Sequence, residues 1–117
     1  MYLSKSGIEV RCSNQENEIT SHIKIPSKLK FFEGHFPDQP ILPAFAIIDI
    51  THELALELKL IKKENFKITN AKFLAALTPE SEIEIKTQKY PNSIDFTWFV
   101  KNKDSTLQKA SELSFEI

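Results

Sequence analysis

Residues 44–60, AFAIIDITHELALELKL, organise the fold expected for this sequence. This stretch is too long for a typical strand, contains no glycine or proline, and ends among good helix formers. Pro43 suits the first turn of a helix, because its missing N–H would have had no partner there. The first part of the stretch is apolar almost all round, broken only by Asp49, which predicts a buried helix.

Period-2 patterns of apolar residues on both sides of this helix predict strands. Turn signals follow at residues 90–93 and 101–106. The expected order is two strands, one helix and about four strands, which predicts an α+β fold with an antiparallel sheet curled around the helix. The expected strands are residues 7–13, 19–25, 70–77, 82–88, 93–101 and 111–117.

The composition fits a small intracellular domain. The 117 residues suit one domain, expected to span 1–117, and a chain this small would gain stability as a dimer. No run approaches the roughly 20 apolar residues of a membrane span, and the first ten residues lack a secretory signal. Cys12 is the only cysteine, so a reducing cytoplasm is expected. The net charge of -1 gives no general attraction to nucleic acid or anionic membrane.

The segment before the helix looks like a rigid loop carrying a histidine. Gly34 is one of only two glycines, and Pro37, Pro40 and Pro43 each fix one backbone angle. His35 lies in this loop, and a histidine is a serviceable general base near neutral pH. The alternative is a structural histidine, hydrogen-bonded at the end of a strand.

Asp49 is the second candidate, since it is the only ionisable residue between Asp38 and His52. A buried carboxyl group tends to hold its proton and can deliver it to a leaving group. The alternative is a surface residue that stabilises the start of the helix. The first backbone N–H groups, those of Ala44 and Phe45, lack partners within the helix and can polarise a carbonyl.

These groups lie within 15 residues of one another in the sequence, from His35 to Asp49. A base, a candidate acid and amide donors suit abstraction of a proton next to a carbonyl, with loss of a β-leaving group. The three histidines and one cysteine show no metal-ligand spacing, so no metal site is expected.

Residues 34–49, GHFPDQPILPAFAIID, resemble the signature G-H-F-P-x-x-P-x-x-P-[G/A]-x-x-x-x-[E/D] of the hot-dog-fold 3-hydroxyacyl-[acyl-carrier-protein] dehydratases. The similarity extends to residues 68–85, ITNAKFLAALTPESEIEI, and to the final strand, so it covers most of the chain. The aspartate together with LPA at 42–44 looks closest to the subgroup associated with aryl-polyene-type lipid pathways.

The resemblance implies a hot-dog fold and a homodimer whose sites each combine the histidine of one subunit with the acid of the other. His35 would take the C2 proton of a 3-hydroxyacyl thioester, and Asp49 of the partner would protonate the departing hydroxyl, leaving a trans-2-enoyl thioester. The resemblance implies no metal or redox cofactor, and it leaves open a dimer or a larger ring of dimers.

The resemblance also implies a substrate-binding set. The N–H of Ala44 would hold the thioester carbonyl, and the C=O of Ile41 would orient the imidazole. Gly34 belongs to the same loop, and Phe45 lies where it can line an acyl tunnel. The implied partner is an acyl carrier protein, which is acidic, so lysines are expected at the tunnel mouth. The candidates are Lys28, Lys30, Lys62, Lys63 and Lys72. Fourteen lysines are scattered over the chain, so for any single one the favoured alternative is an ordinary solvated surface residue.

The sequence departs from the family pattern at several positions. Ala44 replaces the familiar glycine, Asp49 the glutamate of many members, and Glu53 their glutamine. Glu53 would either act on the protonation of Asp49 or face solvent. TPES at 78–81 replaces P-G-D. The alternative function is a non-catalytic hot-dog module that binds acyl thioesters or supports a catalytic partner. A hot-dog thioesterase lacks support in these residues.

Overall fold

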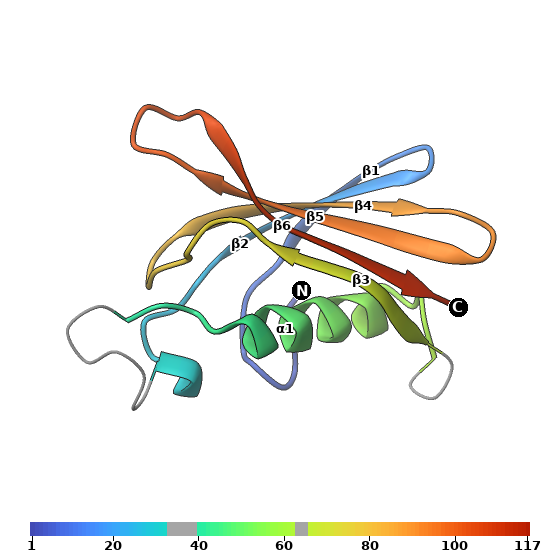
Figure 1. The fold of residues 1–117 in the computed structure, drawn as a ribbon, viewed down its shortest axis with the longest axis horizontal. Helices are drawn as coiled ribbons and strands as arrows, with labels where there is room; N and C mark the ends of the chain where they lie inside the picture. Colours follow the sequence, from blue (N-terminus) through green and yellow to red (C-terminus); the bar gives the residue numbers. More distant parts are fainter. Residues whose placement is uncertain (33–39, 63–65) are drawn as a thin grey trace.

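The computed structural model describes residues 1–32, 40–62 and 66–117. Within these ranges a six-stranded sheet lies against one α-helix, and a short 3-10 helix, η1 (Lys30–Phe32), precedes the helix (Figure 1). The elements are β1 (Arg11–Gln15), β2 (Glu18–Lys24), α1 (Ala44–Glu57), β3 (Lys67–Phe73), β4 (Glu82–Lys89), β5 (Ser93–Lys101) and β6 (Leu107–Glu116).

The strand order is β1-β2-β4-β5-β6-β3, and every neighbouring pair is antiparallel. The helix lies along one face of this curved sheet (Figure 1), so the predicted α+β hot-dog architecture is confirmed. No helix in the described ranges has the length and apolar character that crossing a membrane requires.

The core lies between one face of the sheet and one face of α1. Alternate residues of the central strands are buried, and the register sets Ile85 opposite Trp98 and Phe96 opposite Leu113. Each large side chain is therefore beside another across neighbouring strands, which stabilises a sheet. From the helix, the buried apolar residues are Ala46, Ile47, Ile50, Leu54 and Ala55.

One polar link joins the helix to the sheet inside this core. The indole N–H of Trp98 donates to Thr51 Oγ1 at 2.9 Å, and that hydroxyl donates to the carbonyl of Ile47 at 2.7 Å. Trp98 and Thr51 are both fully buried. The link therefore pairs a buried indole N–H that would otherwise lack a partner.

Four predicted boundaries are wrong. The final strand, expected at 111–117, is β6, which begins four residues earlier, at Leu107. The strand expected at 7–13 is β1 instead, because the chain turns at Gly7, whose φ of 75° is in the left-handed region. The strand expected at 70–77 is β3, which begins three residues earlier and ends at Phe73. The helix ends at Glu57 rather than residue 60, since Lys59 has a φ of 59° and stops it.

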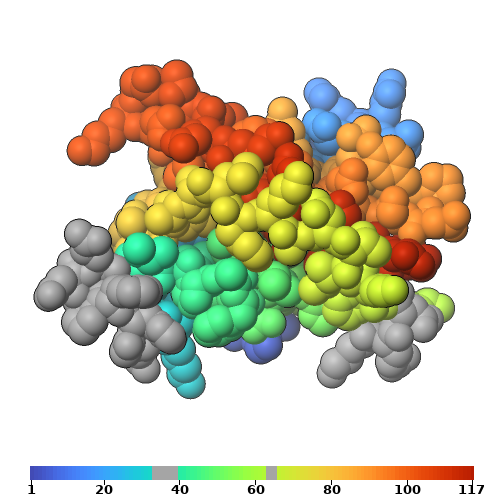
Figure 2. All heavy atoms as spheres, in the orientation of Figure 1, coloured from blue at the N-terminus to red at the C-terminus, as the bar shows by residue number. Residues whose placement is uncertain are grey.

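The prediction that the first part of the helix is buried all round is also wrong for the single chain. Ala44 is exposed, and the residue Phe45 is 53% exposed. Only one face of a helix can contact a sheet, and the opposite face of α1 points away from it. Figure 2 shows the atoms of α1 uncovered on this side of the molecule, next to β3.

The Trp98–Thr51 link predicts a measurable loss of stability. Thr51→Val keeps the shape of the side chain but leaves the buried indole N–H unpaired, so unfolding free energy should fall by about 1–3 kcal/mol. Thr97→Val, the same exchange on the outer face of β5, should change it by less than about 0.5 kcal/mol. Urea unfolding of the two variants makes the comparison, and equal losses would contradict the structural role of the link.

Candidate active site

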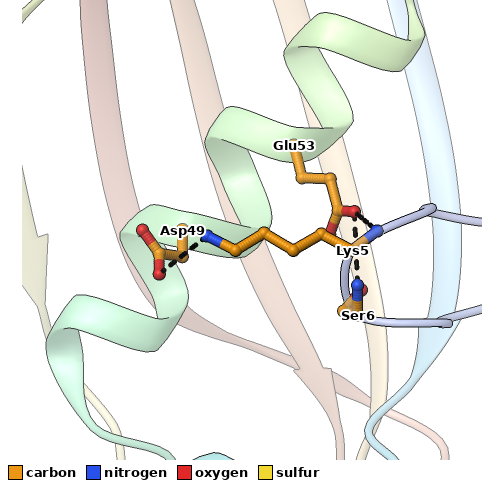
Figure 3. Close-up of polar contacts among 4 residues, drawn as sticks. All are labelled: Lys5, Ser6, Asp49 and Glu53. Atoms are coloured by element: carbon orange, nitrogen blue, oxygen red, sulfur yellow. Dashed lines mark hydrogen bonds and ion pairs between the residues drawn. The ribbon is translucent and has the colours of Figure 1, made fainter.

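Asp49 lies on the second turn of α1, on the side of the helix that the sheet leaves uncovered. Its side chain is 44% exposed, so the prediction of a buried carboxyl group is wrong for the single chain. The carboxylate is 3.7 Å from the ammonium group of Lys5 (Figure 3). The Lys5 side chain is 74% exposed, and an ion pair this open to water contributes less than about 1 kcal/mol to stability.

Glu53, one turn after Asp49, is only 7% exposed. The two predicted alternatives, an effect on the protonation of Asp49 or exposure to solvent, did not include the contacts that Glu53 makes. Its Oε2 accepts hydrogen bonds from the backbone N–H groups of Lys5 and Ser6, the second at 3.3 Å (Figure 3). A buried carboxylate is costly unless such donors satisfy it. Glu53 therefore anchors the N-terminal turn to the helix.

Sequence reasoning missed this turn, although a signal was present. Asp49, Glu53 and Glu57 are spaced four residues apart, which aligns them on one stripe of a helix. All three contact the turn, because the Ser4 hydroxyl also donates to Glu57 at 3.4 Å. We call residues 4–6 the N-terminal strap.

The start of α1 presents the expected amide donor. Hydrogen bonding within the helix begins at Ala46 and Ile47, whose N–H groups both donate to the carbonyl of Pro43, at 3.0 and 3.3 Å. No bond donated by the Ala44 N–H is present among the described residues, and Ala44 is exposed. An amide at the start of a helix can bind a carbonyl oxygen, because the dipole of the helix favours negative charge there.

The segment leading into the helix is tied to the sheet side of the molecule. The N–H of Leu42 donates to the carbonyl of Leu77 at 2.7 Å, and Leu42 is buried while Ile41 is half-buried. Phe45 meets Phe31 edge to face, with ring centroids 5.6 Å apart. Gly34 and His35, the other predicted members of the site, lie outside the described residues.

The other two histidines have packing and surface positions. His52 stacks on Phe66 with ring centroids 4.4 Å apart. His22 lies on β2, where its Nε2 is 3.7 Å from Glu84, beside a hollow of about 840 Å³ that contains none of the candidate residues. No group of metal-ligating side chains occurs within the described ranges.

Two carboxyl groups outside the site have pKa values below their usual range. A hydrogen bond from the Thr106 hydroxyl holds the pKa of Asp104 below its usual value. The Lys109 side chain does the same for the pKa of Glu112. Both lie on or beside the β5–β6 hairpin, and local turn and strand contacts account for both shifts. They therefore do not point to a second catalytic site.

Comparison with known proteins identifies the family. Residues 11–112 match the family model "ApeI-like: ApeI dehydratase". This match covers most of the sequence, so the chain belongs to the ApeI-like dehydratase family, in agreement with the resemblance carried by residues 34–49.

Relatives and solved structures agree with this assignment. The chain is 26% identical over 112 residues to the 3-hydroxyacyl-[acyl-carrier-protein] dehydratase FabZ of Clostridium perfringens, covering 87% of this chain and 80% of that protein. The fold is similar to that of the dehydratase heterocomplex ApeI:P of Xenorhabdus doucetiae, with a TM-score of 0.69, 21% identity, and coverage of 92% of this chain and 96% of that one. An uncharacterised protein of Erwinia carotovora also has a similar fold, with a TM-score of 0.73 and 19% identity. The match covers 93% of this chain and 94% of that one.

The anchoring role of Glu53 predicts a specific loss of stability. Glu53→Ala removes the acceptor of two backbone N–H groups, so the free energy of unfolding should fall by about 1–3 kcal/mol. Glu57→Ala, one turn further along the same stripe, removes a single exposed contact and should cost less than about 0.5 kcal/mol. Thermal or urea unfolding measures both variants. A Glu53→Ala variant as stable as the wild type would contradict the anchoring role of Glu53.

Proposed function

We propose that the chain acts as a single domain, residues 1–117, and removes water from a 3-hydroxyacyl thioester carried on an acyl carrier protein. The proposal is supported by family membership over residues 11–112. The observation that carries it within the structure is the position of Asp49. It lies on the uncovered face of α1 with a side chain 44% exposed, where the site of a second subunit can reach it.

In the proposed reaction, His35 takes the C2 proton of the bound thioester. The N–H of Ala44 holds the thioester carbonyl and stabilises the negative charge that develops on its oxygen. Asp49 of the other subunit protonates the C3 hydroxyl as its bond to carbon breaks. The C2–C3 double bond forms, and the hydroxyl leaves as water, so the product is a trans-2-enoyl thioester.

The remaining predicted residues take positioning roles in this proposal. The carbonyl of Ile41 orients the imidazole of His35, and Gly34 allows the loop its backbone conformation. Phe45 lines the tunnel that holds the acyl chain, because its apolar ring is exposed. Four of the five candidate lysines, Lys28, Lys30, Lys62 and Lys72, are exposed and available to an acidic carrier, while Lys63 lies outside the described residues.

A second subunit is part of the proposal, as a homodimer with shared sites. β3 lies at the end of the strand order, so its outer edge has backbone groups available for pairing with another strand. Ile68, Phe73 and Leu74, on and just after β3, are exposed large hydrophobic residues. Burial of such residues favours association. The heterocomplex formed by the similar ApeI:P proteins also supports assembly from two hot-dog subunits.

That same heterocomplex supports the second candidate function. A chain similar to one member of a two-protein dehydratase can act as the non-catalytic subunit that supports its partner. The two candidates differ in a simple respect, because only the first predicts dehydration by the purified chain alone.

Hydration of a short 2-enoyl thioester, the reverse reaction, tests the catalytic assignment. His35→Ala and Asp49→Asn should each lower kcat/KM by about 10²–10⁴-fold, the range expected for loss of a general base or acid. His22→Ala and Glu116→Gln, which alter an exposed histidine and an exposed carboxylate on the sheet, should retain wild-type activity. Absorbance of the conjugated thioester follows the reaction.

The catalytic proposal fails if the wild type is inactive with every thioester and carrier tried, or if His35→Ala matches it. Activity that appears only when a second hot-dog subunit is added would support the non-catalytic candidate instead.

A further inference from the structure

The N-terminal strap brings a cation to the candidate acid from a part of the chain far away in sequence. Lys5 and Asp49 are 44 positions apart, yet the ammonium nitrogen is 3.7 Å from the carboxylate oxygen. The pair is exposed, so it contributes little to stability. Its geometric effect depends on how firmly the backbone of Lys5 is held.

The strap is held at both ends. Leu3 and Ile8 are buried, and the N–H of Leu3 donates to the carbonyl of Ile8 at 2.8 Å. The N–H of Gly7 donates to the carbonyl of Leu3 at 2.7 Å, with the glycine in the left-handed conformation that the turn requires. These bonds close a tight turn whose flanking side chains are in the core.

Glu53 then fixes the orientation of this turn on the helix. Its carboxylate accepts the N–H groups of both Lys5 and Ser6, and Figure 3 shows the Lys5 side chain running from this anchor along the helix to Asp49. Glu53 and Asp49 are separated by one helical turn, about 6 Å, a distance that an extended lysine side chain spans. The Glu53 carboxylate thus fixes the backbone of Lys5, and the side chain of Lys5 contacts the Asp49 carboxylate.

From this arrangement we infer that Lys5 is a positioning residue for Asp49. The ion pair holds the Asp49 carboxylate in one side-chain conformation on the uncovered face of α1. This inference rests on the proposed function, in which Asp49 gives its proton to the departing hydroxyl and becomes the carboxylate that Lys5 contacts; in the reverse hydration that carboxylate takes a proton from the attacking water. An acid held in one conformation loses less rotational freedom when the substrate arrives. Removing the lysine therefore lowers the rate of the chemical step and leaves substrate binding unchanged.

The variant that tests this is Lys5→Met, which keeps the length of the side chain and removes its charge. Because residue 5 is exposed, the fold should be retained, as a thermal unfolding curve checks. Lys5→Arg restores a cation that can reach the carboxylate. Lys103→Met, in the turn between β5 and β6, is the matched control because it removes an exposed lysine remote from α1.

The first readout does not depend on activity. Three-bond Hα–Hβ couplings of Asp49, measured by nuclear magnetic resonance, should report one dominant χ1 conformation in the wild type, Lys5→Arg and Lys103→Met. Lys5→Met should show averaged couplings. Unchanged couplings in Lys5→Met would overturn the inference. If Lys5→Met shows averaged couplings but the wild-type protein has no dehydratase activity, the positioning role of Lys5 is upheld. The proposed dehydratase activity is then rejected.

The second readout separates positioning from substrate binding. Lys5→Met should lower kcat about two- to fivefold, matching an interaction of up to about 1 kcal/mol, with KM unchanged. Lys5→Arg should recover the rate, and Lys5→Met should cause no further loss in an Asp49→Asn background. A raised KM for the carrier-bound substrate with kcat retained would instead assign Lys5 to carrier docking and overturn the inference.

Discussion

The structure depends on the packing of one face of α1 against the curved sheet. Ile47, Ile50 and Leu54 face the sheet, and the hydrogen bond from Trp98 to Thr51 joins the two layers inside the core. This contact fixes the rotation of the helix about its own axis. It therefore decides that Phe45 and Asp49 point away from the sheet, where a substrate or a second subunit can reach them.

The carboxylates on α1 divide between two tasks along one stripe. Glu53 and Glu57 contact the N-terminal strap, while Asp49, nearest the start of the helix, keeps almost half of its side chain exposed. Glu53 is buried, and two backbone donors satisfy its carboxylate, whereas Asp49 and Glu57 remain accessible to solvent. The departure from the glutamine of many family members at position 53 thus has a structural explanation.

The helix and the six strands were predictable because their signals are local. An apolar stretch without glycine or proline predicted α1, and alternating residues such as Ile94, Phe96 and Trp98 predicted the central strands. The strap was not predicted, because the four-residue spacing of Asp49, Glu53 and Glu57 aligns them on one stripe of the helix without showing which backbone they contact. The backbone that Glu53 binds is 48 positions away in the sequence. Hydropathy also could not show which face of the helix was covered, so the sequence left open whether Asp49 is buried or lies at the surface.

In the proposed dehydratase, each site combines His35 of one subunit with Asp49 of the other. Mixing inactive His35→Ala and Asp49→Asn chains under conditions of subunit exchange tests it most directly. A mixed dimer then holds one intact site, so statistical pairing should restore about a quarter of wild-type activity. No recovery, with exchange verified by native mass spectrometry of the mixed dimers, would contradict a site shared between subunits.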